Sequence, residues 1–264
     1  MYRVGNGGVG GDWQFKLAVG RPIADWEAIF SRITDIPSMP LLSISSLKKS
    51  FVLPEGGRRT IVNVPEFRLP SGQQLALRGE SGSGKTTFLH LIAGILAPDA
   101  GSIFIGERDM AKLKESARDR LRAESVGYIF QTFNLLQGYT CLENVLLGMS
   151  FGPGADRARA RAVLERVGLG RRLHHYPRQL STGQQQRVAV ARAMANRPKL
   201  VLADEPTGNL DRKNARESLG LIRETCRESG AALLLVSHDP HVYEEFEDPQ
   251  NFDDLNLAVK ETLS

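Results

Sequence analysis

The feature that most restricts the fold of this chain is the run Gly-Glu-Ser-Gly-Ser-Gly-Lys-Thr at residues 79–86. It fits the pattern GxxxxGK[ST] and lies between an expected strand at 73–78 and an expected helix from Lys85 to about Leu96. Glycines at 79, 82 and 84 let backbone N–H groups face inward around an anion, and the positive end of the following helix adds to the attraction. The run therefore predicts an α/β fold that binds phosphate groups.

Two side chains of this loop have expected roles toward a nucleotide. The ammonium of Lys85 would bridge the β- and γ-phosphates, and the hydroxyl of Thr86 would hold Mg²⁺. The alternative is a turn rich in glycine and serine that is followed by a solvated lysine. Pattern and position together favour the phosphate loop.

Two apolar runs near the carboxyl end, residues 200–203 and 231–236, are separated by a helical segment at about 212–229. This βαβ arrangement predicts a parallel sheet covered on both faces, with ligands at the carboxyl ends of the strands. Asp204 and Glu205 follow the first run directly. Asp204 is expected to reach the Mg²⁺ shell and Glu205 to act as the general base toward water, whereas the alternative is an acid that caps the next turn.

Composition narrows the class of protein. The chain has 264 residues, 41% hydrophobic and 24% charged, which is typical of a globular protein. A net charge of +4 is too small to favour nucleic acid as a partner, so none is expected. Cys141 and Cys226 have no CxxC spacing, which argues against a disulfide framework or a zinc site. No apolar run approaches the roughly 18 residues of a membrane span, and the first residues lack the features of a secretory signal.

Changes in composition along the chain predict three parts. Residues 1–38 form a glycine-rich extension, loosely ordered or not native, with Met39 as a plausible initiator. Residues 39–240 form the α/β domain, with an antiparallel β subdomain near its start and a helical subdomain at about 132–190. Residues 241–264 form an acidic segment, expected to be a peripheral helix or tail.

Further motifs stand in a fixed order along the chain. Gln131 and His238 each follow an expected strand, and the run Leu-Ser-Thr-Gly-Gln at 180–184 precedes a helix. Taken alone, Gln131 reads as a solvated polar residue, His238 as a turn histidine and the run at 180–184 as a helix cap. Together with the phosphate loop and the acids after residue 203, these motifs resemble the nucleotide-binding subunits of ABC transporters over about residues 41–238.

The resemblance implies a P-loop NTPase core of the ABC ATPase type with ATP and Mg²⁺ as its cofactors. It implies that the catalytic residues are Glu205, His238, Gln131 and Lys85, and that Thr86, Gln131 and Asp204 hold the metal. The residues implied to bind nucleotide are Phe51, Gly79, Ser81, Gly82, Ser83, Gly84, Lys85, Thr86, Thr87, Ser181, Gly183, Gln184 and Asp211. For Phe51, packing in the core is the alternative to stacking on adenine, because a phenyl ring fits both.

The resemblance also implies partners. Two copies would close head to tail over two ATP molecules, each phosphate loop facing the signature motif (residues 181–184) of the other copy. A separate integral-membrane permease would dock on residues 132–143, where Phe133, Leu135, Leu136 and Tyr139 are apolar for a loop. The chain would then be cytoplasmic and peripheral on the inner face of the cell membrane.

The runs LADEPTGNLD and FQTFNLL favour the branch of lipoprotein-release and macrolide exporters. The alternatives are a soluble ABC ATPase that acts on DNA or ribosomes, a cell-division-type ABC ATPase without transport, and a catalytically weak regulatory binder. Two departures from the family pattern stand out. Thr182 replaces the first glycine of the signature motif, and residues 246–255 are acidic and contain no glycine.

Overall fold

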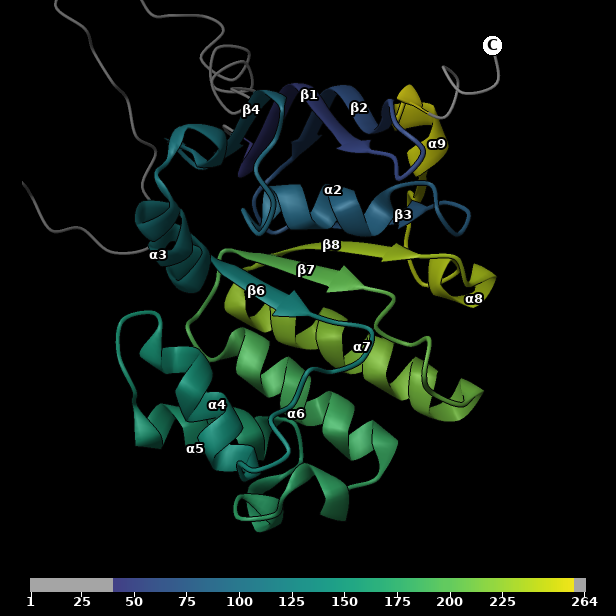
Figure 1. The fold of residues 1–264 in the computed structure, drawn as a ribbon. Coiled ribbons are helices and arrows are strands. Elements are labelled where there is room, and N and C mark those ends of the chain that lie inside the picture. The colour runs from purple at the N-terminus through teal and green to yellow at the C-terminus, as the bar shows by residue number, and fades with distance from the viewer. Residues whose placement is uncertain (1–39, 259–264) are drawn as a thin grey trace, which may run out of the picture. The chain divides into compact units, whose positions relative to one another are not determined.

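The computed structural model describes residues 40–258, shown as a ribbon in Figure 1. Two of the expected features, the glycine-rich extension at 1–38 and the last six residues of the acidic segment, lie outside the described residues. Among the described residues no helix is both long and apolar enough to cross a membrane.

An antiparallel sheet forms the first layer, with strand order β2-β1-β4-β5. Its members are β1 Leu42–Val52, β2 Arg58–Leu69, β4 Ala100–Ile105 and β5 Arg108–Asp109. The long strands β1 and β2 pair in antiparallel register, with Ile44 opposite Phe67 and Leu47 opposite Val64. This is the antiparallel β subdomain that the sequence predicts.

A parallel sheet of five strands forms the second layer, in the order β6-β7-β8-β3-β9. Its members are β3 Gln74–Arg78, β6 Val126–Ile129, β7 Leu200–Asp204, β8 Ala232–Ser237 and β9 Gln250–Asn251. Since β3, β6, β7 and β8 are parallel neighbours, their carboxyl ends lie at one edge of the sheet. The phosphate loop, Gln131 and His238 follow strand ends at that edge, and Asp204 is the last residue of β7.

Alternation along the central strands separates two cores on opposite faces of the parallel sheet. Leu200 and Leu202 of β7 face the core that contains α2 (Lys85–Ile92) and the antiparallel sheet. Val201 and Ala203 face the other core. In Figure 1, α2 covers one face, and α6 and α7 cover the opposite face. Successive side chains of a strand point to opposite faces, so an unbroken apolar run supplies both cores.

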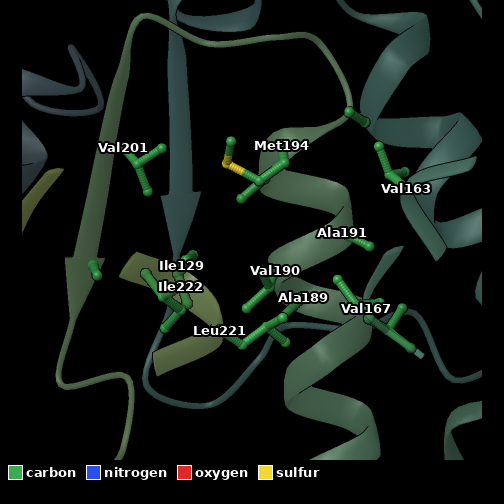
Figure 2. Packing of buried hydrophobic residues seen from close by; sticks show 14 of the residues in the cluster. Ile129, Val163, Val167, Ala189, Val190, Ala191, Met194, Val201, Leu221 and Ile222 are labelled. Atoms are coloured by element: carbon green, nitrogen blue, oxygen red, sulfur yellow. The ribbon is translucent and has the colours of Figure 1, made fainter. Parts of the chain in front are cut away.

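The second core is made largely by four helices. These are α4 Cys141–Ser150, α5 Arg157–Arg166, α6 Thr182–Met194 and α7 Arg212–Ser229. Figure 2 shows Val190 and Met194 of α6 packed between the strand residues Ile129 and Val201 on one side and Val163 of α5 on the other. The basic stretch around α5 therefore has a buried apolar stripe, with Arg157, Arg161 and Arg166 exposed and Arg159 half-buried.

Two helices differ from the sequence prediction in extent. Helix α2 ends at Ile92 rather than near Leu96, because Gly94 at φ 66° terminates it before Pro98 is reached. The helix expected around 112–123 is α3 at Glu115–Ser125, preceded by a short 3₁₀ turn at Met110–Lys112. The helix expected at 212–229 is α7 with those bounds.

The carboxyl-terminal segment is not a peripheral helix or tail over its described part, and that prediction was wrong. After the short helix α8 (Pro240–Tyr243), β9 adds an edge strand to the parallel sheet beside β3, and α9 (Phe252–Leu255) follows. Phe252 and Asn256 are fully buried. Glu247, Asp248 and Asp254 of the segment are exposed, so its acidic composition concealed a few buried anchors.

Candidate active site

The phosphate loop, residues 79–84, connects β3 to α2. Gly84 forms the N-cap of α2 at φ 99°, a left-handed conformation that favours glycine. A Cβ atom at Gly84 would lie 2.7 Å from the carbonyl oxygen of Ile61, so the loop passes directly against β2 at this point. Both the conformation and the close approach explain why glycine is required there.

Lys85 is buried at the first turn of α2. Its Nζ donates hydrogen bonds of 2.7 Å to the carbonyl oxygens of Gly79 and Glu80. Burial lowers the pKa of Lys85, and the nearby charge of Glu205 opposes that shift. The ammonium is thus held inside the phosphate loop, next to the carboxylate predicted to be the base.

Thr86 and Asp204 bring α2 and β7 together. The hydroxyl of Thr86 donates to Oδ1 of Asp204 over 3.1 Å. Burial raises the pKa of Asp204, while the hydrogen bond from Thr86 acts in the opposite direction. A hydroxyl and a carboxylate at this spacing are hard oxygen donors of the kind Mg²⁺ prefers.

Glu205 occupies a strained position just after β7. Its φ is 44°, unusual for a residue other than glycine, and its amide still donates to Val236 O over 3.0 Å. Oε1 lies 2.8 Å from Nδ1 of His238 and 4.0 Å from Nζ of Lys85. Backbone strain of this kind is typical of functional sites, and here it accompanies the contact of the carboxylate with His238.

Ser237 completes the surroundings of that carboxylate. Its buried hydroxyl donates to Oε2 of Glu205 over 2.9 Å, and the backbone N–H of His238 donates to the same oxygen over 3.3 Å. Tyr243 in turn donates to the carbonyl oxygen of Ser237. Both carboxylate oxygens are therefore oriented by donors on the loop after β8.

Gln131 lies near the loop that follows β7. Its carbonyl oxygen accepts a hydrogen bond of 2.7 Å from Nδ2 of Asn209. A Cβ atom at Gly208 would lie 3.2 Å from Nε2 of Gln131, so the glutamine amide lies close to that glycine. The side chain is exposed, at the edge where the strands end.

Phe51 near the end of β1 does not pack in the core. The residue is 40% exposed, and Nζ of Lys49 lies 5.6 Å from the centre of its ring. Val52 and Leu53 beside it are also exposed. This exposure excludes the interpretation of Phe51 as a core residue and leaves stacking on adenine as the other interpretation.

Ser181, Gly183 and Gln184 begin α6. Ser181 Oγ accepts from the amide of Gln184, and Oε1 of Gln184 accepts from the amide of Ser181, which is a capping box. Figure 1 shows α6 on the face of the sheet opposite α2. The structure therefore does not bring these residues to the phosphate loop of the same chain.

Asp211 caps α7. Its Oδ1 accepts a 3.0 Å hydrogen bond from the amide of Asn214, and these contacts lower the pKa of Asp211. Asn214 also lies against α6, because a Cβ atom at Gly183 would be 3.0 Å from its Oδ1. The run at 208–211 thus links the loop after β7 to the start of α6.

The loop after Gln131 differs from the expectation in its exposed residues. Phe133 and Leu135 are each only 8% exposed and belong to the second core, so they cannot form a docking surface. Leu136 and Tyr139 are 43% and 44% exposed. The side chain of Asn144 in α4 fixes this loop. Its Oδ1 accepts from the amide of Leu136, and its Nδ2 donates to the carbonyl oxygens of Leu136 and Tyr139.

Comparisons with known proteins decide the family. The family described as "ABC transporter" matches residues 62–208. The chain belongs to the ABC transporter family. It is 42% identical over 204 residues to the lipoprotein-releasing system ATP-binding protein LolD of Shewanella sp. (strain MR-4), covering 76% of this chain and 87% of that protein. LolD of Shewanella denitrificans is 40% identical over 230 residues, covering 85% of this chain and 97% of the relative.

Solved structures of this ABC family agree. A dimeric post-hydrolysis state of the ATP-binding cassette MJ0796 bound to ADP and Pi has a TM-score of 0.72 at 33% identity, covering 80% of this chain and 93% of that chain. A second dimeric MJ0796 structure has a TM-score of 0.71. The predicted fold, a P-loop α/β core with an antiparallel β subdomain, is confirmed. The chain is the ATP-binding, ATP-hydrolysing subunit of an ABC transporter and is similar in sequence to LolD-type proteins.

Ser237 and Asn209 are contacts of the site that sequence reasoning did not assign. Ser237 holds the carboxylate of Glu205, and Asn209 holds the backbone of Gln131. Each is a neighbour of a predicted site residue, His238 or Asp211. For Ser237 a signal did exist, because it ends an apolar strand and small polar residues at such an end commonly orient a charged neighbour.

Proposed function

We propose that this ABC ATPase powers a separate integral-membrane permease of the lipoprotein-release type. The proposal is supported by the similarity to LolD over most of both chains. It is also supported by the position of Lys85 and His238 beside the carboxylate of Glu205. The proposed location is the cytoplasmic face of the membrane, where the permease would be reached.

In the proposed reaction Glu205 orients and deprotonates the water that attacks the γ-phosphate. Its oxygens are already aimed by Ser237 and by Nδ1 of His238, at 2.9 and 2.8 Å. Lys85 would move from the loop carbonyls to the phosphates, a short displacement for a flexible side chain. His238 has a side chain that is 61% exposed, so its other ring nitrogen would contact the γ-phosphate.

Mg²⁺ would be held by Thr86, Asp204 and Gln131, and when bound it would neutralise charge on the phosphate oxygens. The donors fit this ion because the Thr86 hydroxyl and the Asp204 carboxylate already lie 3.1 Å apart.

Phe51 would stack on the adenine, which its exposure permits.

We infer a homodimer in the working state. Ser181, Gly183 and Gln184 lie on the opposite side of the sheet from α2 in one chain, so they would reach a γ-phosphate only across an interface. The similar MJ0796 cassettes are dimeric. The exposed start of α6 would then point its backbone N–H groups toward the nucleotide of the partner subunit.

The test is isolation of the tagged full chain from detergent-solubilised membranes of the cells that produce it. An integral-membrane protein isolated with the chain in stoichiometric amount, and stimulation of the ATPase rate when the two are joined in vesicles, would support the proposal. Recovery of the chain with nucleic acid or ribosomes and no membrane protein would contradict it.

A further inference from the structure

The side chain of Asn256 is buried between the phosphate loop and β2. Its Nδ2 donates to the carbonyl oxygen of Ser83 over 3.0 Å and to that of Ile61 over 2.9 Å. Its Oδ1 accepts from the amide of Asn63 over 2.7 Å and from the amide of Ala258 over 3.3 Å. Both hydrogens and both acceptor sites of one amide are used, and the residue is 0% exposed.

The phosphate loop needs such a donor behind it. A loop that turns its N–H groups inward toward an anion leaves carbonyl groups pointing outward. At Ser83 the outward side is covered by the carboxyl-terminal segment, and the next residue, Gly84, lies so close to Ile61 O that a Cβ would be 2.7 Å away. A buried carbonyl group without a donor is costly, so the amide of Asn256 stabilises this backbone conformation.

The other end of the loop is also in contact with this segment. A Cβ atom at Gly79 would lie 3.4 Å from Cβ of Phe252. The ring of Phe252 is fully buried and its centre lies 5.2 Å from that of Phe88 in α2. Pairing of β9 with β3 fixes the segment to the strand that leads into the loop, with Gln250 opposite Leu77. The segment at 250–258 therefore supports both ends of the phosphate loop.

We propose that Asn256 is a positioning residue for ATP binding, which acts through the backbone of Ser83 and touches no reacting atom. By holding Ser83 O and Ile61 O with one amide, it keeps the loop in the shape that receives phosphate. Asn256 belongs to the carboxyl-terminal segment, which was predicted from the sequence to be a peripheral helix or tail. The consequence is that loss of this amide weakens nucleotide binding more than it slows the chemical step.

The test compares two variants of the full chain. Asn256→Ala removes the whole amide, and Asn256→Asp keeps an acceptor for Asn63 N but presents oxygen to the two carbonyls. Each is expected to raise KM for MgATP about tenfold or more while kcat stays within about twofold, because the lost bonds shape the loop equally in the ground and transition states. Asp254→Ala is the matched control, since Asp254 is an exposed residue of α9 in the same segment.

A purely structural role would lower the melting temperature of both Asn256 variants and leave KM of the folded molecules unchanged, and that outcome would overturn the proposal. An equal rise of KM in Asp254→Ala would overturn it as well. If neither Asn256 variant folds, hydrogen exchange of the unaltered chain decides. MgADP should then slow exchange at residues 250–258 together with the phosphate loop, and protection of the loop alone would contradict the proposal.

Discussion

Oε1 of Glu205 lies 2.8 Å from Nδ1 of His238, across the ends of two neighbouring parallel strands, β7 and β8. A carboxylate oxygen only accepts, so the imidazole donates this hydrogen bond from Nδ1, and the other ring nitrogen, Nε2, points away from the carboxylate. The pair thus orients both the predicted base and the ring of the residue predicted to contact phosphate.

Ser237→Ala should lower kcat about tenfold and leave KM for ATP nearly unchanged. The hydroxyl of Ser237 is the buried donor to Oε2 of Glu205, and its loss frees the carboxylate to rotate. Steady-state ATPase kinetics measure both constants. Ser218→Ala is the control, because Ser218 is a buried serine of α7 whose hydroxyl has no hydrogen-bond partner among residues 40–258, and its variant should keep the wild-type rate.

Lys85→Ala should weaken MgATP binding about 10- to 100-fold, because a charged donor inside the phosphate loop is removed. Calorimetric titration of the folded variant gives the dissociation constant directly. A dissociation constant equal to that of the unaltered chain would show that Lys85 contributes nothing to binding the phosphates.

Leu136→Glu combined with Tyr139→Glu should abolish association with the membrane partner and spare ATP binding. Both side chains are more than two fifths exposed on the loop after Gln131, and burial of charge at an interface is unfavourable. Co-isolation from solubilised membranes is the measurement. Phe151→Glu alters an apolar side chain that is 71% exposed beyond α4 and should keep the partner, whereas loss in both variants would argue against this docking site.

Neither cysteine should react with a maleimide in the folded chain at neutral pH. Cys141 and Cys226 are both buried, and burial raises the pKa of the Cys226 thiol to about 12. The reactive thiolate therefore stays scarce as the pH rises through about 8.5, where an exposed thiol would ionise. For the same reason the stabilising contribution of protonated Cys226 is lost as the pH rises toward about 12. Mass spectrometry should detect both adducts only after denaturation, and rapid labelling of native protein would contradict the burial.

The sequence was sufficient to locate most of the predicted site residues in the fold. Asp204 and His238 follow unbroken apolar runs, and parallel strands bring such ends to one edge, so their proximity was predictable. The burial of Phe133 and Leu135 next to exposed Leu136 was not predictable. Which apolar residues of a loop are buried depends on contacts with distant parts of the chain, and the local sequence does not show these contacts. Asn256 was hidden for a related reason: the partner Ser83 lies 173 positions earlier, and local composition carries no signal of that contact.

The most direct test of the account is the turnover of Glu205→Gln in the full chain. The amide keeps the shape of the carboxylate and cannot take a proton from water, so kcat should fall by at least about 100-fold while MgATP still binds. Bound ATP that is not hydrolysed should also hold two copies together, which size-exclusion chromatography with MgATP would detect as a dimer. ATP hydrolysis by this variant at the rate of the unaltered chain would contradict the assignment of Glu205 as the base.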